Sequence, residues 1–173
     1  MDVENDHPPE ELEEARQPTL TDLVSLCREL NTRNALYIVI GGFAIRAAGY
    51  DRTTMDVDLL IATDLENEAR VVAALATLPD QAILEMAPGE VEAYSVVRVG
   101  DEIVVDLMKS ACGIDYAEAS HEIDYHEIRG VRIPFASPRL LWRMKVSTHR
   151  EKDAADLFFL RRLLAARGIP LPE

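Results

Sequence analysis

The stretch GGFAIRAAGYDRTTMDVDLLI, Gly41–Ile61, decides the fold of this chain. It follows the continuous apolar run LYIVI, Leu36–Ile40, which is typical of a short buried strand. The paired glycines end that run, and the next residues predict a short helix that stops at Gly49. From Asp56 the chain returns to a strand pattern, DVDLLI, so two carboxylates stand among residues that are otherwise apolar.

Asp56 and Asp58 point to one face of the predicted strand, because side chains alternate along a strand. Two like charges side by side repel each other and lose solvation on burial, so we expect a cation to neutralise them. Mg²⁺ accepts carboxylate oxygens and keeps water and phosphate oxygens as its other ligands. Two such ions about 3.5–4 Å apart clamp the attacking and leaving oxygens of a phosphoryl transfer. The third carboxylate of such a site would be Asp106, which follows the apolar run Ile103–Val105.

The two glycines have a function in the same scheme. Gly41 and Gly42 have no Cβ, so backbone N–H groups at the start of the next helix can approach a triphosphate closely. A lone D-x-D pair is most often a solvated strand edge, and a lone glycine pair is weaker evidence still. The combination of apolar strand, glycine pair, short helix, acid pair and further strand acid favours a phosphoryl-transfer site.

The composition fits one folded domain with an acidic tail. The chain has 173 residues, 48% of them apolar, which is enough for a core. Residues 1–17, rich in acids and prolines, are predicted to be a disordered tail before a single domain over 18–173. We expect no membrane segment and no signal peptide. Two cysteines outside any C-x-x-C pattern are typical of free thiols in a reducing cytosol, so the sequence predicts a cytoplasmic protein.

The charge distribution gives two opposing expectations about nucleic acid. Thirty-one acids against 18 lysines and arginines give a net charge of −13, which opposes phosphate contacts along a long nucleic acid. The C-terminal third is locally basic, which leaves contact with an RNA end open. This basic set is Arg139, Arg143, Lys145, His149, Arg150, Lys152, Arg161, Arg162 and Arg167.

The rest of the pattern predicts helices mixed with short antiparallel strands. Helices are expected over residues 19–33, 65–78, 137–148 and 151–167, the last two forming a C-terminal pair within about 137–168. Strands are expected over 92–99 and 102–108, joined by a turn at Gly100-Asp101, and over 121–128 and 131–135. Residues 109–120 are expected to be weakly structured.

Two acids stand on the apolar stripe of the last predicted helix. Asp156 shares a face with Leu160, and Asp153 lies one turn before it. A buried charge needs a partner. Two interpretations stay open: Lys145 pairs with these acids between the two helices, or Lys145 and Lys152 bind a triphosphate as point charges.

These motifs resemble those of the nucleotidyltransferase (polymerase β-like) superfamily. The resemblance covers about Leu36 to Leu164, from the glycine and acid pairs to the C-terminal SPRLLWRMKVSTHREKDAADLFFL. Within the superfamily, GGFA followed by GYDRTTMDVD is most similar to the bacterial group related to AbiEii toxins. Many members of that group have a histidine before the Gly-Tyr step, where this chain has Ala48.

The resemblance implies an α+β fold, a mixed β-sheet flanked by helices and closed by the C-terminal helical pair. It implies an enzyme that moves an NMP from an NTP to a hydroxyl acceptor and releases pyrophosphate. Asp56, Asp58 and Asp106 would be the catalytic ligands of two Mg²⁺ or Mn²⁺ ions, with Asp106 also a candidate base. The residues implied to bind nucleotide are Gly41, Gly42, Arg52, Thr54, Lys145, Lys152, Asp153 and Asp156. For Arg52 and Thr54 the alternative is a plain surface loop.

The implied acceptor is an RNA end such as that of tRNA, a protein side chain or a small molecule. A toxin role would add a cognate antitoxin or another partner protein. One competing function is a non-catalytic binding protein on the same fold, either an antitoxin or a pseudoenzyme. The presence of all three acids argues against a dead site and leaves a partner role open. Another is a glycosyltransferase that uses a nucleotide sugar, which would need a longer chain and would leave the glycine pair unexplained.

Overall fold

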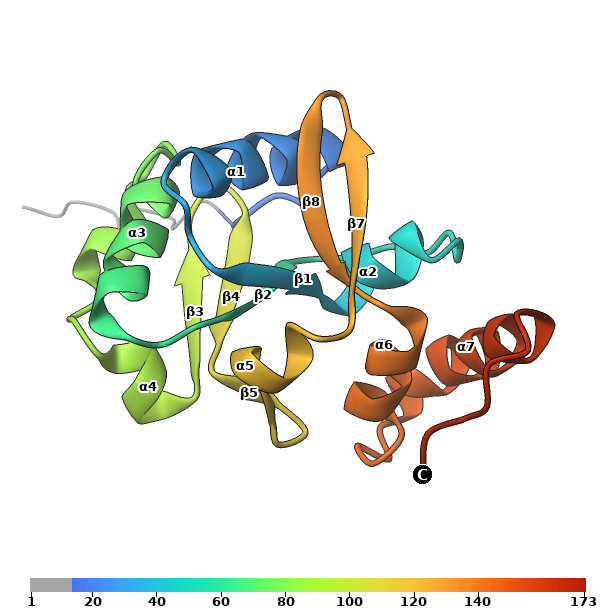
Figure 1. Cartoon of the computed structure of the whole chain (residues 1–173). Coiled ribbons are helices and arrows are strands. Elements are labelled where there is room, and N and C mark those ends of the chain that lie inside the picture. The colour runs from blue at the N-terminus through green and yellow to red at the C-terminus, as the bar shows by residue number, and fades with distance from the viewer. Residues whose placement is uncertain (1–13) are drawn as a thin grey trace, which may run out of the picture.

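A six-stranded mixed sheet forms the centre of the computed structural model, which describes residues 14–173 (Figure 1). Its strand order is β3-β4-β2-β1-β8-β7. The strands are β1 (Tyr37–Ile40), β2 (Val57–Ile61), β3 (Val96–Gly100), β4 (Val104–Met108), β7 (Ile123–Ile128) and β8 (Val131–Ala136). The neighbours β2 and β4 are parallel, as are β1 and β8, whereas the other pairs are antiparallel. The predicted α+β fold with a mixed sheet is confirmed.

Seven α-helices surround this sheet in the described part of the chain (Figure 1). They are α1 (Leu20–Thr32), α2 (Gly41–Ala47), α3 (Leu65–Leu75), α4 (Glu90–Tyr94), α5 (Tyr116–Ala119), α6 (Pro138–Lys145) and α7 (Ala154–Ala166). Shorter elements are the 3-10 turns η1 (Ala82–Glu85) and η2 (Glu151–Asp153) and a hairpin of β5 (Ser110–Ala111) and β6 (Ile114–Asp115). As predicted, α6 and α7 pack together, and α6 also contacts α2 and β8. None of the helices within residues 14–173 is long and apolar enough to cross a membrane.

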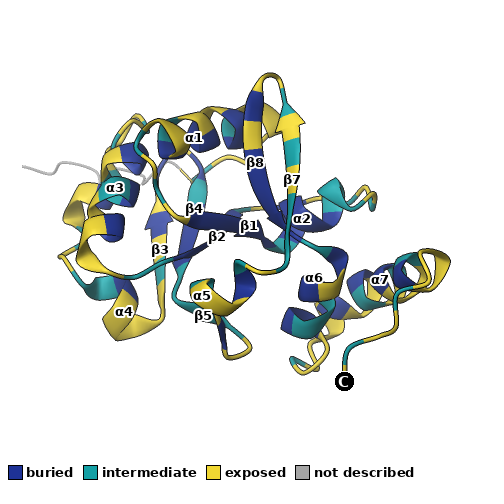
Figure 2. Ribbon diagram, viewed as in Figure 1, coloured by how far each residue is buried: buried dark blue, intermediate teal, exposed yellow. Residues whose placement is uncertain are grey.

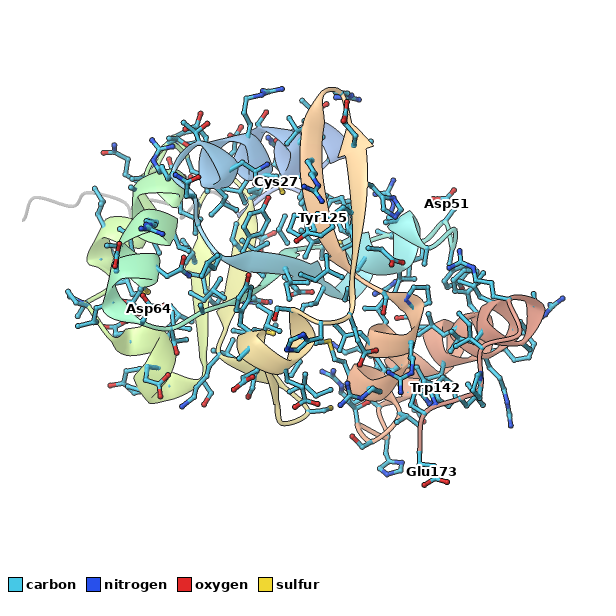
Figure 3. All side chains as sticks on the ribbon, viewed as in Figure 1. Cys27, Asp51, Asp64, Tyr125, Trp142 and Glu173 are labelled. Atoms are coloured by element: carbon cyan, nitrogen blue, oxygen red, sulfur yellow. The ribbon has the colours of Figure 1, made fainter. Side chains whose placement is uncertain are left out.

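The core lies along the central strands (Figure 2). Strand β1 is buried over its whole length, and β2 is buried except at Asp58. A strand covered on both faces has a continuous apolar run in its sequence, which explains YIVI. Leu36, which was predicted to begin the strand, lies before it and is exposed. The two cysteines are free thiols: Cys27 is a buried residue of α1 (Figure 3). Cys112 is exposed.

Side-chain caps fix where the main helices begin. Thr19 and Asp22 form a capping box at α1, in which Asp22 accepts a hydrogen bond from the Thr19 N–H at 2.7 Å. Asp64, labelled in Figure 3, accepts from the Asn67 N–H at 2.9 Å and begins α3. Ser137 begins α6 by accepting from the Leu140 N–H at 3.2 Å.

The predicted tail differs from the structure at its C-terminal end, while residues 1–13 lie outside the described residues. Arg16 donates to both carboxylate oxygens of Asp22, at 2.7 and 2.8 Å, and to Glu102 at 3.3 Å. The ordered chain therefore begins before residue 18.

Two other segments also differ from the prediction. The strand expected over 92–99 is helix α4 as far as Tyr94, and β3 begins only at Val96. Val91 is fully buried, so one turn of helix covers the sheet edge there, and Ser95 ends the turn with φ +67°. Residues 109–120 contain β5, β6 and α5, and Asp115 caps α5 by accepting from the Glu118 N–H at 3.0 Å.

Replacement of Ser137, the side-chain cap of α6, should lower the free energy of unfolding. Ser137→Ala removes the acceptor for the Leu140 N–H, so the free energy of unfolding should fall by about 1 kcal/mol. Ser137→Asp keeps an acceptor and should unfold close to wild type. Urea denaturation of the three proteins measures the difference, and equal midpoints for the alanine variant and wild type would contradict the capping role.

Candidate functional site

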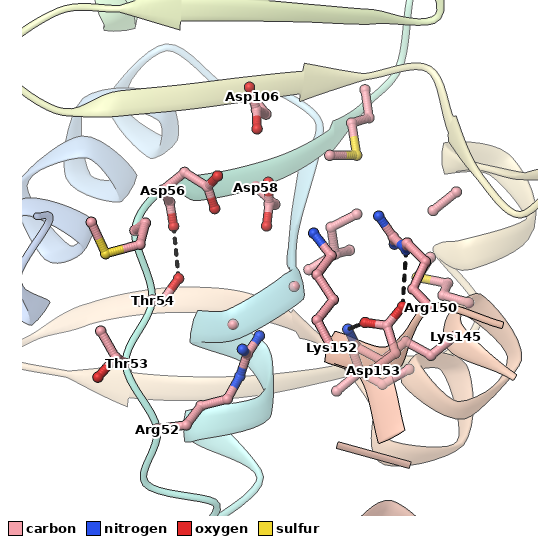
Figure 4. A pocket seen from close by; sticks show the side chains of 18 of the residues that line it. Arg52, Thr53, Thr54, Asp56, Asp58, Asp106, Lys145, Arg150, Lys152 and Asp153 are labelled. Carbon is pink, nitrogen blue, oxygen red and sulfur yellow. Dashed lines mark hydrogen bonds and ion pairs between the residues drawn. The ribbon is translucent and has the colours of Figure 1, made fainter. Parts of the chain in front are cut away.

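Three carboxylates meet at one end of the central sheet (Figure 4). Asp58 of β2 and Asp106 of β4 are direct neighbours in the parallel register, and Asp56 immediately precedes β2. Oxygen atoms of all three acids lie within 4.8 Å of one another. The sheet therefore brings together the three acids that the sequence predicts to act together.

This closeness has an electrostatic cost. Burial, and then the charges of Asp56 and Asp106, raise the pKa of Asp58 to about 7. Burial, followed by the charge of Asp106, also raises the pKa of Asp56. Both shifts have the direction expected when like charges share a partly desolvated place. The positive charges around the three acids therefore do not fully compensate their negative charges.

The glycine pair makes room for this cluster. A Cβ on Gly41 would lie 2.1 Å from Asp58 Oδ2, and the φ of Gly41 is +65°, where a side chain is strained. A Cβ on Gly42 would lie 2.5 Å from Thr54 Oγ1. Both glycines are thus required by packing within the protein itself, a reason that the sequence alone does not reveal.

A polar pocket of about 490 Å³ opens over the three acids (Figure 4). The predicted site residues in its lining are Gly41, Gly42, Arg52, Thr54, Asp56, Asp58, Asp106, Lys145, Lys152 and Asp153. Figure 4 shows the acids on one side, and Arg52, Lys145, Arg150 and Lys152 reach the pocket from the other elements. A pocket with carboxylates facing cations suits a ligand that carries both bound metal and phosphate.

Comparison with known proteins gives structural matches but no sequence match. No protein-family model matches the chain, and a search of curated proteins finds no significant relative. An antigenic nucleotidyltransferase-like protein from Paracoccidioides brasiliensis has a TM-score of 0.53 at 19% identity, over 88% of this chain and 78% of the other. A protein of Thermotoga maritima assigned to the nucleotidyltransferases has a TM-score of 0.51 at 15% identity, over 87% and 98%. The chain has the nucleotidyltransferase fold.

A third similar structure carries a ligand. It is a lincosamide antibiotic adenylyltransferase bound to lincomycin, with a TM-score of 0.50 at 12% identity, over 86% of this chain and 99% of the other. At such identities the likeness confirms the fold that the sequence motifs predict. The closer similarity to the group related to AbiEii toxins stays a prediction.

In this nucleotidyltransferase fold, both interpretations of Lys145 have support. Its Nζ atom lies 3.0 Å from Asp153 Oδ1 and 3.2 Å from Asp156 Oδ2, so it pairs with both acids between α6 and η2–α7. Lys145 also lines the pocket. Asp156 is outside that lining and pairs with Arg52 at 3.2 Å. Asp156 therefore holds Arg52 and Lys145, two cationic side chains of the pocket, from outside its lining.

The loop before the acid pair is not a plain surface loop. Thr54 is buried, and its hydroxyl donates to the Asp56 carbonyl oxygen at 3.0 Å. Thr54 thus fixes the backbone that carries Asp56. Arg52, with one nitrogen on Asp156, keeps the rest of its guanidinium at the pocket. The surface-loop alternative is wrong for Thr54.

Sequence reasoning missed Arg98 and gave no site role to Arg150. Arg98 stands opposite Asp106 in the β3–β4 pair and donates to Asp106 and Asp56. A tight turn at Gly100-Asp101 would have placed other residues opposite each other, but the observed register pairs Gly100 with Val104. Asp101 makes the wider turn by accepting three backbone N–H groups, from Asp80, Ala82 and Glu102. The sequence showed the alternation of both strands, but the tight turn expected at Gly100-Asp101 gave the wrong register between them.

Gly41→Ala should be far more damaging than a matched glycine substitution. Gly168 has φ +66° and open space around it, so Gly168→Ala isolates the backbone cost, about 1 kcal/mol. Gly41→Ala adds a clash with Asp58 and should lower the free energy of unfolding by roughly 3 kcal/mol or more. The double variant Gly41→Ala, Asp58→Ala should recover part of that loss. Equal effects of the two glycine substitutions in urea denaturation would contradict this assignment.

Without metal, Asp58 should make the protein less stable as the pH rises. The pKa of Asp58 is about 7 in the folded protein against 3.8 ordinarily, so the folded state keeps a proton that the unfolded state releases. This contribution is complete below about pH 3.8 and is lost as the pH rises through about 7. In a chelating buffer, the melting temperature of wild type relative to Asp58→Asn should fall across this window. Parallel curves for the two proteins would show that Asp58 titrates normally.

Proposed function

We propose that this protein is a divalent-metal-dependent nucleotidyltransferase that moves an NMP from an NTP to a hydroxyl acceptor and releases pyrophosphate. The observation that carries the proposal is the meeting of three carboxylates within 4.8 Å, in a pocket whose other walls supply cations. The fold supports it, because one similar structure is an adenylyltransferase.

The donor set fits Mg²⁺ or Mn²⁺. All three candidate ligands offer hard carboxylate oxygens, and Gly41 leaves the space in which Asp58 Oδ2 lies. After burial, the charges of Asp56 and Asp106 raise the pKa of Asp58, and a bound cation would relieve that repulsion. Two bound ions would neutralise charge at the reacting phosphate and activate the attacking hydroxyl.

The cations opposite the acids are suited to hold the triphosphate. Lys152 is exposed in the pocket lining and forms no ion pair with any residue in the described range. The charges of Lys152 and Arg52 offset part of the rise in the pKa of Asp56 that burial and Asp106 cause. The start of α2 at Gly41 and Gly42 has no side-chain cap, which leaves backbone N–H groups for a phosphate oxygen. We assign triphosphate binding to these groups with Lys145 and Arg150.

The surface charges favour a small acceptor over an RNA end. Several members of the basic C-terminal set are already paired: Arg139 with Glu122, and Arg143 with Glu118 and Glu122. Lys145 and Arg150 are paired with Asp153. The local basic patch is therefore weaker than the sequence suggests, which reduces its attraction for a nucleic acid. We accordingly propose a small hydroxylated molecule as acceptor, while the antitoxin partner and the cytoplasmic location stay predictions.

Substitution of the acids should abolish transfer without unfolding the protein. With α-labelled NTPs, Mg²⁺ and a panel of hydroxylated small molecules, we expect acceptors that gain the mass of an NMP. Asp106→Asn should lower that rate by roughly 10³-fold or more, because a metal ligand is lost. Asp115→Asn, which alters an acid that caps α5 outside the pocket lining, is the control and should keep the wild-type rate.

A full rate in Asp106→Asn would refute the mechanism. An absence of any transfer by the wild-type protein, across all four NTPs and with RNA ends included among the acceptors, would instead favour the non-catalytic binding protein. Lys152→Gln tests the triphosphate assignment, since it should raise KM for the NTP more than it lowers kcat.

A further inference from the structure

We propose that Arg98 holds the place of a divalent cation between Asp106 and Asp56, and that metal binds only by displacing it. The proposal rests on the proposed metal-dependent function. It gives a role to the contacts between Arg98 and the acid cluster, to which the proposed transfer assigns no function.

The contacts of Arg98 are those of a bridging cation. Its Nε donates to Asp106 Oδ1 at 2.9 Å, and its Nη2 donates to Asp106 Oδ2 at 3.0 Å. The same Nη2 donates to Asp56 Oδ2 at 3.0 Å. One guanidinium therefore engages both oxygens of one candidate metal ligand and one oxygen of a second. A two-pronged contact of this kind is the strongest geometry for an arginine and a carboxylate.

Arg98 and a metal ion cannot share these oxygens. A divalent cation coordinated by Asp106 and Asp56 would lie next to the guanidinium, and two positive charges a few ångströms apart repel each other strongly. Within residues 14–173, Arg98 is the only basic side chain that forms an ion pair with any of the three acids. The conflict is therefore between the metal and this residue.

The position of Arg98 allows it to leave. Its strand, β3, is at the edge of the sheet, and its side chain is 63% exposed. The guanidinium can turn into solvent without moving the core, because β3 stays paired with β4 through the backbone. Asp106, by contrast, is buried and fixed in β4.

The exchange makes binding of metal and of nucleotide depend on each other. A metal ion without nucleotide must break the contacts of Arg98, and its ligands are then only water and carboxylate oxygens. A metal–nucleotide complex brings phosphate oxygens into the pocket, which offer the released guanidinium a new anionic partner. Metal and nucleotide then raise each other's affinity, which is a coupling between two ligands. Arg98 thus keeps the site closed to metal until the nucleotide arrives.

The test compares two arginines with the same pattern of contacts. Arg16 donates to both oxygens of Asp22 and to Glu102, as Arg98 does to Asp106 and Asp56, but lies outside the pocket lining. Calorimetric titration with Mn²⁺ alone should show Arg98→Gln binding roughly three- to thirtyfold tighter than wild type. Arg16→Gln should bind Mn²⁺ as wild type does. In a chelating buffer both variants should melt at lower temperature, and Mn²⁺ should restore only Arg98→Gln.

A second variant and a nucleotide probe complete the test. Arg98→Lys keeps the charge but loses the two-pronged contact, so its Mn²⁺ affinity should lie between those of wild type and Arg98→Gln; it decides the matter if Arg98→Gln does not fold. The gain in affinity for α,β-methylene-ATP on adding Mn²⁺ should be smaller in Arg98→Gln than in wild type. If Arg98→Gln binds Mn²⁺ as wild type does or more weakly, the displacement of Arg98 is refuted, whereas the proposed function is not. An absence of Mn²⁺ binding in every variant would overturn the metal site and the proposed function with it.

Discussion

The pairing of β2 with β4 is the constraint on which the rest of this structure depends. It places Asp58 directly beside Asp106 at the end of a buried sheet, with Asp56 just before β2. Three negative charges so close together, at least partly removed from water, repel each other, so neighbouring elements must supply compensating charge. The fold is otherwise an ordinary mixed sheet with an apolar centre, and its unusual features gather around these carboxylates.

Each neighbouring element compensates for the three carboxylates in a different way. Strand β3 supplies Arg98 from the edge of the sheet. Helix α6 supplies Lys145, whose charge offsets part of the rise in the pKa of Asp58 that burial and the other two acids cause. Helix α7 holds Lys145 in place through Asp156. Helix α2 begins with Gly41, where any side chain would meet Asp58. Elements far apart in the sequence thus contribute charge or space to one cluster of acids.

The sequence predicts what depends on local pattern and misses what depends on register. The apolar run before Gly41, the alternation around Asp56 and Asp58, and the helix cap at Ser137 are all readable because neighbouring residues determine them. Arg98 was not found, since its partner depends on how three residues of a turn fold around Asp101. The sequence singled out Gly41 and Gly42 but gave only part of the reason for glycine there. Asp58 and Thr54 come close to them only in the folded chain.

The cost of the acid cluster also bears on what the protein does. A carboxyl group whose pKa is about 7 in the folded state, against 3.8 ordinarily, weakens the fold at neutral pH as long as it is ionised without a partner. A protein that only presented this surface to another protein would be more stable with asparagine at position 58. The arrangement becomes favourable once a divalent cation enters, because the repulsion among the acids then turns into ligand affinity. Repulsion of this kind, held in a pocket that cationic side chains also line, is the feature that the proposed catalytic function accounts for and a simple binding surface does not.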